Sequence, residues 1–516
     1  MMRTLPDRIA WFIVGVILMP VFGWAQPEYP EHPRLDAANP TAAVILPSNS
    51  VSHMAFREPA SLWIGTGKGL ARTTDGGMSW ESFRFLPEFV NEGIFAIALR
   101  GDTVWSSTGF TKDVEDEGVQ TGSGFTYSLD NGATWTHRPQ PLDSPSDSIV
   151  QYGQNIVRFL PIVVQEQNVT FDIALDDSAV WAASWSSGLR KSTDLGRTWQ
   201  RIVLPSDSRS SISPSDSLGR YNVDPRLNNN FLAFSVYVES PRMIWSGTAG
   251  GINKSTDGGI SWTRFTRQNQ NAPILANWVI AIGGQPLGPN TRIWTTNWVA
   301  GQNEQFGVSY SDDGGRIWKN VLHGLRAYAF AFKDSITYVA TEQGIYRTPD
   351  GGSTWTASGA IVDRTTGEQI RSSAVFSVSV IGDTVFIGTG DGIAKTVDNA
   401  SHPFGKEWQV LRSFQPLQQP AQTYAYPNPF SPRSDVARIH YATRTDQESV
   451  TIEIFDFGMN RVRSVVHDAL RSGPQEHDEV WDGRDDNNTQ VSNGVYFYRV
   501  VVNGSDPSWG KIMVLQ

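Results

Sequence analysis

The sequence predicts an all-β protein, a seven-bladed β-propeller followed by a small C-terminal Ig-like β-sandwich. The first observation is a phrase, Ser/Thr-x-Asp-x-Gly-x-Ser/Thr-Trp, that recurs in six copies, with a seventh copy that is interrupted. The second is that three short apolar segments precede each copy, which gives four strands and three turns per repeat. The third is that the phrase stops before residue 418, where a different strand pattern begins. A repeated four-stranded unit is typical of a propeller blade.

The strands of each repeat follow one order. Each repeat begins with a strand of alternating apolar residues, such as 95–99 in the second repeat. A second strand follows it; in the first repeat this strand is 62–64, which reads Leu-Trp-Ile. The third strand begins at a glycine, as at Gly69, and runs into the repeated phrase. Seven such units predict a propeller over residues 42–417.

The repeated phrase predicts a tight turn and a wedge between neighbouring sheets. The aspartate can accept backbone N–H bonds within its own turn, and the glycine supplies the positive φ that the turn needs. The tryptophan is large enough to fill an apolar gap, so we expect the six tryptophans of the near-complete copies to be buried between sheets. The expected structural residues are Asp75, Trp80, Asp130, Trp135, Asp194, Trp199, Asp257, Trp262, Asp313, Trp318, Asp350, Trp355 and Asp398.

On these residues the propeller segment resembles the Asp-box family, also called the bacterial neuraminidase repeat. The resemblance covers residues 42–417 and implies the propeller fold. The same repeat serves sialidases, sortilin-type receptors, xyloglucan hydrolases and photosystem assembly factors, so it implies no single chemistry. In this family the phrase lies between the third and fourth strands, away from the ligand face.

Residues 1–25 are predicted to be a secretory signal peptide. Arg3 and Arg8 precede an apolar run over 11–22, and the residues at 23–25 read Gly-Trp-Ala, which suits a cleavage site. The run is too short to span a membrane, and no later segment is long enough. Residues 26–41 follow as an N-terminal extension. We therefore expect an exported protein, secreted or at the cell surface, without a membrane span.

Composition and charge argue against several partners and sites. The chain has 42 Lys and Arg against 52 Asp and Glu and no basic run, which argues against nucleic acid as a partner. It has no cysteine, which excludes disulfides and thiolate metal sites, and its 8 histidines show no metal-ligand spacing. We expect no metal, no cofactor and a monomer.

The chain changes character after the propeller. Residues 418–425 form a predicted linker, and the alternating strands over 426–516 predict a compact antiparallel sandwich. This domain resembles the C-terminal Ig-like domains of type IX secretion cargo and the related flagellar hook-cap fold. The resemblance implies a sorting domain that engages the outer-membrane secretion machinery, although the Trp-Asp-Gly at 481–483 favours the hook-cap variant. The matching segments are 426–430, 452–456, 480–485, 493–498 and 511–515.

Long insertions map to the two loop classes that share the ligand face in this repeat family. Long loops on a rigid scaffold often carry binding residues. Trp185 and Trp298 lie near that face outside the repeat pattern and are candidate platforms for a ligand, with Trp278 as a weaker third. The alternative is that they are anchors packed into neighbouring loops. The insertions are 108–124, 137–168, 205–230, 266–277, 297–307 and 358–373.

No catalytic set can be assembled from named residues. Sialidases of this fold need an Arg-Ile-Pro motif near the first blade, whereas the nearest phrase here, at 158–161, reads Arg-Phe-Leu-Pro and follows the second blade. A glycosidase needs two carboxylates at roughly 5–10 Å across a cleft. The candidate carboxylates in the predicted ligand-face loops are Asp113, Glu115, Asp116, Glu117, Glu166 and Glu304.

Two hypotheses follow from the sequence. The first is an exported, non-catalytic propeller that binds a glycan or a cell-surface protein, delivered by its C-terminal domain. The alternative is a secreted glycoside hydrolase that acts on polysaccharide and is closer to xyloglucan hydrolases than to sialidases. The first is favoured because the sequence offers no assembled catalytic set.

Overall fold

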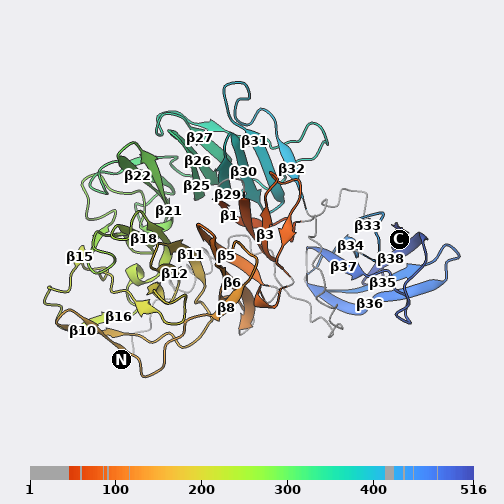
Figure 1. Ribbon diagram of the computed structural model, residues 1–516, viewed down its shortest axis with the longest axis horizontal. Helices are drawn as coiled ribbons and strands as arrows, with labels where there is room; N and C mark the ends of the chain where they lie inside the picture. Colours follow the sequence, from red (N-terminus) through yellow and green to blue (C-terminus); the bar gives the residue numbers. More distant parts are fainter. Residues whose placement is uncertain are drawn as a thin grey trace. The chain divides into compact units, whose positions relative to one another are not determined.

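Seven antiparallel sheets follow one another along the first part of the chain in the computed structural model (Figure 1). The structure describes residues 46–412 and 423–515, apart from 58–60, 85, 90–91, 115–116, 434–435, 446 and 473–474. The predicted signal peptide, the N-terminal extension and most of the predicted linker lie outside the described residues. Two compact units are distinguished, one within 46–412 and the other within 423–515. Among the described residues, no helix is long and apolar enough to cross a membrane.

Blades 1 to 4 pair their strands in chain order, and the 3-10 helix η1 (Pro87–Phe89) lies between blades 1 and 2. Their strands are β1 (Val51–Arg57), β2 (Ser61–Thr66), β3 (Gly69–Thr73) and β4 (Glu81–Ser82); β5 (Gly93–Arg100), β6 (Thr103–Val114), β7 (Glu117–Ser128) and β8 (Thr136–Pro139); β11 (Thr170–Leu175), β12 (Val180–Ser184), β13 (Gly188–Ser192) and β14 (Gln200–Arg201); β17 (Ala233–Val238), β18 (Ile244–Thr248), β19 (Gly251–Ser255) and β20 (Trp262–Phe265).

Blades 5 to 7 repeat the same order. Their strands are β21 (Trp278–Leu287), β22 (Asn290–Trp298), β23 (Gly307–Ser311) and β24 (Lys319–Val321); β25 (Ala327–Lys333), β26 (Ile336–Thr341), β27 (Gly344–Thr348) and β28 (Thr356–Ala357); β29 (Val375–Ile381), β30 (Thr384–Thr389), β31 (Gly392–Val397) and β32 (Gln409–Leu411).

The seven sheets close into a ring through their first strands. Each first strand packs beside the first strand of the next blade, and β29 packs beside β1. Blades 1 and 7 are each built from consecutive strands, so the described residues close the ring without exchanging a strand. At this seam, Lys395 Nζ donates to the carbonyl of Gly76 at 2.5 Å, and Ser377 Oγ donates to that of Val51 at 3.4 Å. The predicted fold class, an all-β propeller, is confirmed.

The repeated phrase forms a turn, the Asp-turn, in which the aspartate gathers donors from its neighbours. In blade 1, the hydroxyl of Thr73 donates to Asp75 Oδ1 at 2.8 Å, and the amides of Met78 and Ser79 donate to the same oxygen at 2.9 Å. The hydroxyl of Ser79 donates to the other oxygen and, together with these bonds, lowers the pKa of Asp75 to about 2. Equivalent hydroxyl and amide bonds surround Asp130, Asp194, Asp257 and Asp350.

Two Asp-turns depart from this pattern. In blade 5, Ile317 stands where the other copies have their second hydroxyl residue, so Asp313 takes a hydroxyl bond from Ser311 and an amide bond from Ile317. In blade 7, the insertion before the closing tryptophan changes the turn, and Asp398 is buried beside Arg347, which donates to it. The phrase therefore keeps its aspartate but not its full bonding in these two blades.

The closing tryptophan of an Asp-turn packs against the preceding blade. Trp199 of blade 3 stacks on Phe125 of blade 2, with ring centroids 5.0 Å apart. The glycine of the turn also seats on that blade, since a Cβ on Gly259 would lie only 2.4 Å from the ring of Trp181. Because Gly259 also has a φ of +92°, the position requires glycine for both space and conformation.

The closing tryptophans differ in burial, and two of the buried ones lie under a segment from outside their own turn. Trp262 lies under Ile212 of a neighbouring insertion, and Trp318 packs with Ile274 from the loop before blade 5. The prediction that all six would be buried is wrong for three of them. Trp80, Trp262 and Trp318 are buried, whereas Trp135, Trp199 and Trp355 are half-buried.

A cation from one blade also holds the Asp-turn of the next. Lys191 Nζ lies 4.7 Å from the ring centroid of Trp181 on its own blade and donates to the carbonyl of Gly258 at 3.4 Å. Lys254 repeats this arrangement one blade later, at 3.0 Å from the carbonyl of Gly314. The lysine at the seam makes the same type of bond, so the seam resembles the internal boundaries.

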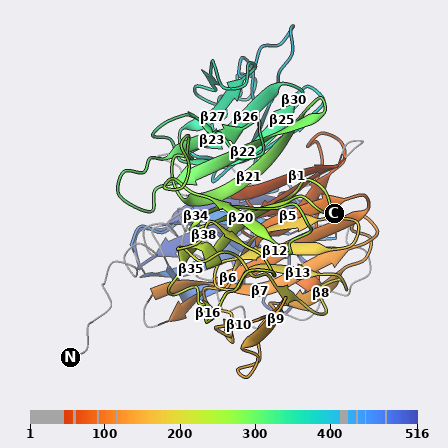
Figure 2. The same ribbon diagram turned by 90° about the vertical axis from the view of Figure 1, so that its left-hand side faces the viewer.

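Two of the predicted ligand-face loops contribute strands to a small sheet. β9 (Ile149–Tyr152) and β10 (Asn155–Phe159) lie within 137–168, and β16 (Tyr221–Val223) lies within 205–230. β10 pairs antiparallel to β9 and parallel to β16, and the three strands lie together in Figure 2. β10 and β16 are also labelled in Figure 1. β15 (Ser211–Ile212) adds to the edge of blade 4 beside β20, and η2 (Asn229–Phe231) follows.

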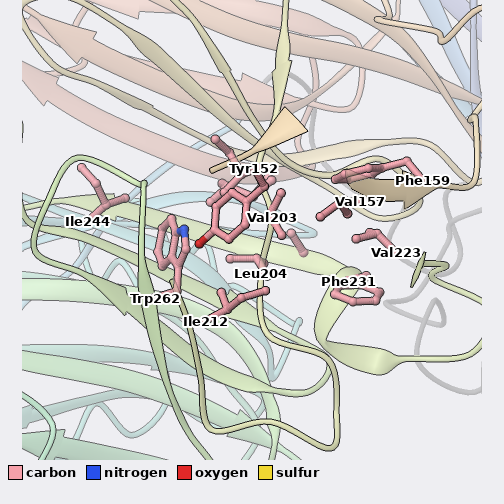
Figure 3. Close-up of a cluster of buried hydrophobic side chains, with 14 of the residues drawn as sticks. Tyr152, Val157, Phe159, Val203, Leu204, Ile212, Val223, Phe231, Ile244 and Trp262 are labelled. Atoms are coloured by element: carbon pink, nitrogen blue, oxygen red, sulfur yellow. The ribbon is translucent and has the colours of Figure 1, made fainter. Parts of the chain in front are cut away.

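This inserted sheet shares one apolar core with blades 3 and 4. Tyr152, Leu204 and Ile212 pack in the same cluster as Trp181 and Trp262, as Figure 3 shows for most of them. The apolar side chains of these two insertions therefore fill space between blades 3 and 4. Figure 3 also labels Val157, Phe159, Val203, Val223, Phe231 and Ile244.

The second unit contains two antiparallel sheets around one core. Tyr441, Ile452, Trp481, Tyr498 and Ile512 are all buried in a single cluster that draws on both sheets. One sheet has the order β33-β34-β37 and the other β36-β35-β38-β39. The strands are β33 (Thr423–Tyr426), β34 (Ala437–Ala442), β35 (Gln447–Phe455), β36 (Arg461–Ser472), β37 (Glu476–Trp481), β38 (Gly494–Val502) and β39 (Ser508–Val514).

Replacing the closing tryptophans should destabilise the propeller in proportion to their cover. We expect Trp262→Ala to lower the free energy of unfolding by about 3–5 kcal/mol, because it leaves a cavity in a closed core. Trp199→Ala should cost less, since solvent already reaches that ring. Urea unfolding of both variants measures the difference, and equal losses would contradict the role given to the covering segments.

Candidate functional site

Every first strand of the propeller carries a β-bulge close to its start. The register with the second strand shifts by an extra residue between positions such as Thr170 and Asp172 in blade 3. The shift occurs at the equivalent place in all seven blades. A bulge re-aims a side chain away from the regular alternation of a strand. The residues within the shifts are Ser52, Phe95, Phe171, Phe234, Ile280 with Ala281, Tyr328 and Phe376.

Five of these bulge positions are aromatic, and the rings of four of them pair across blade boundaries. Ring centroids lie 6.0 Å apart between Phe171 and Phe234, and 5.3 Å apart between Tyr328 and Phe376. We call these four residues and Phe95 the aromatic belt. Because the first strands lie next to one another around the ring, the belt lies along its inner edge on five of the seven blades. Phe234 is buried and the other four are half-buried, so part of the belt is accessible to a ligand.

The three tryptophans predicted as platforms pack against rings of the belt. Trp185 lies 5.1 Å from Phe234 and 6.0 Å from Trp278 between ring centroids. Trp298 lies 5.6 Å from Tyr328 and donates its indole N–H to the carbonyl of Ala327 at 2.9 Å.

All three tryptophans are buried, at 5–7% exposure. Trp185 and Trp298 therefore do not present open faces, and this packing agrees with the alternative that they are anchors packed among neighbouring side chains. The structure brings Trp185 together with Trp278, whereas Trp298 belongs to a separate group of rings. The signal missed in the sequence is the aromatic residue that recurs near the start of the first strand.

Two ionisable side chains follow bulge positions. Asp172 accepts the amides of Ile173 and Val236, each at 2.9 Å, and so links blade 3 to blade 4. Burial raises the pKa of Asp172 to about 7, even though both amide bonds favour its charged form. Burial lowers the pKa of His53 to about 4, and its ring contacts Ser52 Oγ at 3.0 Å. Near pH 7 the histidine is neutral and the carboxyl is partly protonated.

A second carboxyl with a raised pKa lies at the entry to blade 2. Glu92 directly precedes β5 and accepts a bond from the hydroxyl of Ser123, which also contacts Thr108 Oγ1 at 3.0 Å. Burial raises the pKa of Glu92 to about 7. Glu92 was not among the predicted candidates, since its sequence position looks like an ordinary blade-linking residue.

The predicted carboxylates serve structural roles where their side chains are described. Glu166 pairs with Lys112 at 2.6 Å, which lowers the pKa of Glu166. Glu304 accepts the amides of Ala300 and Gly301 at 2.7 and 3.0 Å and so holds its own loop. The side chains of Asp113, Glu115, Asp116 and Glu117 lie outside the described part.

The other sequence candidates add no catalytic set. Arg158, from the phrase compared with the sialidase motif, is exposed on β10 of the inserted sheet. Within the described ranges, no group of three or more histidine, aspartate or glutamate side chains could hold a metal ion. A groove of about 490 Å³ lies at the outer side of blade 4, lined in part by Lys254, Trp262 and Arg316, and its lining includes no residue of the belt.

Comparison with known proteins gives partial matches. No protein-family model matches the chain. It is 24% identical over 246 residues to a probable oligoxyloglucan-reducing end-specific xyloglucanase of Neosartorya fischeri, over 44% of this chain and 26% of that protein. It is 23% identical over 265 residues to a xyloglucanase of a Paenibacillus species, over 41% of this chain and 25% of that protein. The chain thus spans about a quarter of the length of the curated relatives it matches.

Solved structures with a similar fold include two bacterial proteins. One is the GH74 xyloglucanase from Xanthomonas campestris, at 15% identity and a TM-score of 0.49, over 77% of this chain and 59% of that one. The other is PorZ, described as an essential surface component of the type-IX secretion system of Porphyromonas gingivalis, at 13% identity and a TM-score of 0.35, over 90% of this chain and 66% of that one.

Proposed function

We propose that this protein is an exported, non-catalytic propeller of the Asp-box type that binds a neutral glycan at the aromatic belt. The observation that carries the proposal is the repeated bulge, which places an aromatic side chain at the same position in five of seven blades. The electron-rich face of an aromatic ring attracts the C–H groups of a sugar ring. A cell-surface protein is the alternative partner.

A neutral ligand fits the charge state of this region. His53 is uncharged near neutral pH, and Asp172 is held by two backbone amides. The belt itself contains only phenylalanine and tyrosine, so it offers apolar faces with few hydrogen-bonding groups. Such a surface favours stacking on a sugar over binding a charged group. Since two relatives are named xyloglucanases, xyloglucan fragments are the first ligands to test.

A secreted glycoside hydrolase is the second candidate function. Both curated relatives carry a xyloglucanase name, and a glycosidase needs a carboxylic acid that is protonated near neutral pH. Asp172 and Glu92, each with a pKa of about 7, have that property. We favour the non-catalytic function because the predicted carboxylates Glu166 and Glu304 are engaged in structural contacts.

We further propose that the two ends of the chain direct export. Residues 1–25 would act as the signal peptide, and the domain over 426–516 would act as the type IX sorting signal. Support for the second step is the resemblance of its segments at 426–430, 480–485 and 511–515 to such domains. The mature protein would then be secreted or lie at the cell surface.

Removing belt rings should weaken glycan binding. We expect Phe171→Ala combined with Tyr328→Ala to lower the affinity for xyloglucan oligosaccharides by about tenfold or more, because two stacking faces are lost. Isothermal titration calorimetry on the mature protein measures the effect. Met78→Ala, which removes a side chain that is 76% exposed in an Asp-turn, serves as the control and should bind normally. Unchanged affinity in the double variant would contradict the proposed site.

The mature protein should release no reducing ends from xyloglucan. A reducing-sugar assay between about pH 5 and about pH 8 covers the range in which Asp172 and Glu92 titrate. Release that disappears in Glu92→Gln or Asp172→Asn would overturn the non-catalytic proposal and establish the hydrolase.

Export should depend on the C-terminal domain. A chain that ends at residue 420 should keep its glycan affinity but accumulate in the periplasm, because it lacks the folded sorting signal. Residues 421–516 fused behind a signal-peptide-bearing reporter should carry that reporter to the surface or medium. Cell fractionation measures both, and normal export of the shortened chain would show that the domain is a spacer.

A further inference from the structure

The outward face of one sheet in the second unit exposes a group of aromatic side chains. Phe457 is 80% exposed and Trp509 is 44% exposed, whereas Phe455 and Phe497 are half-buried beside them. We call these four residues the aromatic platform. Contiguous exposed apolar surface on a soluble domain marks an interaction site more often than a chance feature.

The register of the sheet places the platform on three adjacent elements. Phe455 on β35 pairs directly with Phe497 on β38, and Trp509 on β39 pairs with Arg499 on β38. Ring centroids lie 5.4 Å apart between Phe455 and Trp509 and 6.2 Å apart between Phe457 and Phe497. Since alternate residues of a strand point to opposite faces, the platform lies opposite the core.

The core of the same sheet is complete without the platform. Ile454, Tyr498 and Ile512, which alternate with platform positions along their strands, are each fully buried. Exposed aromatic rings add nothing to that core and leave apolar surface in water. The platform is therefore not explained by the stability of the sandwich.

A paired arginine holds two platform rings in place. The guanidinium of Arg499 lies 5.4 Å from the ring centroid of Phe455 and 5.8 Å from that of Trp509. The same guanidinium donates to the carboxylate of Glu453, which also lies 3.4 Å from Arg461. Its charge is thus neutralised within the sheet face, and the rings are fixed before any ligand arrives.

We propose that the aromatic platform binds the flat face of a neutral polysaccharide chain. Stacked rings on an open sheet face can contact several sugars of an extended polymer, whereas they cannot enclose a small molecule. An anionic lipid surface would need a cluster of free basic residues, but Arg499 is ion-paired with Glu453, and Arg461 beside Phe455 is ion-paired with Glu453 and Asp486. Lys511 is an exposed cation beside Phe497. Lys511 can donate a hydrogen bond to a sugar hydroxyl at the edge of the platform.

The proposal is tested with the full mature protein on insoluble polysaccharides. Protein is mixed with microcrystalline cellulose, insoluble xylan or chitin, and the bound fraction is measured by depletion. We expect at least one of these solids to bind the wild type, and Trp509→Ala and Phe457→Ala each to reduce its partition coefficient about five- to tenfold. Both side chains are exposed, so the melting temperature should stay unchanged.

Two control variants separate this surface from other effects. Leu470→Ala removes an apolar side chain that is 65% exposed on the same sheet but outside the platform, and should bind normally. Ile156→Ala, which removes a side chain that is 58% exposed on β10 of the propeller and outside the belt, should also leave retention on the solid unchanged.

Three outcomes would overturn the platform proposal. The first is equal retention of the wild type and the Trp509→Ala, Phe457→Ala double variant on the solids. The second is no retention on any of the three solids, together with binding to phosphatidylglycerol vesicles that depends on the platform. The third is a dimer in light scattering that depends on the platform, without polysaccharide binding. The second would identify a lipid surface as the occupant, and the third a second copy of the chain.

Discussion

The ring depends on the contact between each Asp-turn and the blade that precedes it. A turn glycine approaches the preceding blade so closely that a Cβ would lie 2.9 Å from the ring of Trp63 at Gly132, and 3.1 Å from that of Trp105 at Gly196. The aspartate fixes the turn through local hydrogen bonds. In several blades, a lysine of the preceding blade donates a hydrogen bond to the carbonyl of a glycine in the turn. Local hydrogen bonding and packing between blades are thus two uses of the same eight residues.

The double role of these eight residues explains why the propeller can be predicted from the sequence. The Asp-turn is formed by eight consecutive residues, so each blade can be predicted from a local sequence pattern alone. The inserted sheet was missed because β10 and β16 pair in parallel across more than sixty intervening residues, and such pairing leaves no local pattern. The prediction that all six closing tryptophans are buried was wrong for the same reason. Their burial depends on segments distant in the sequence, such as the one that contains Ile212.

The candidate site was harder to predict because its residues lie at β-bulges, which the sequence pattern does not reveal. In the sequence, Phe95 or Phe376 looks like one more apolar residue of an alternating strand, and only the shifted register separates it from its neighbours. The isolated tryptophans at 185 and 298 attracted attention because they break the repeat, yet they support the belt from buried positions. In this protein, the first strand of the repeated unit carries half-buried aromatic residues at the propeller's inner edge.

The way the ring closes has a consequence for the chain's topology. The boundary between blades 7 and 1 uses a lysine-to-carbonyl bond and a serine-to-carbonyl bond, as the boundary between blades 4 and 5 does through Lys254 and Ser235. No strand is shared across it among the described residues. The boundary that closes the ring therefore resembles an internal one, and a circularly permuted chain that began at the boundary between blades 4 and 5 would be expected to specify the same ring.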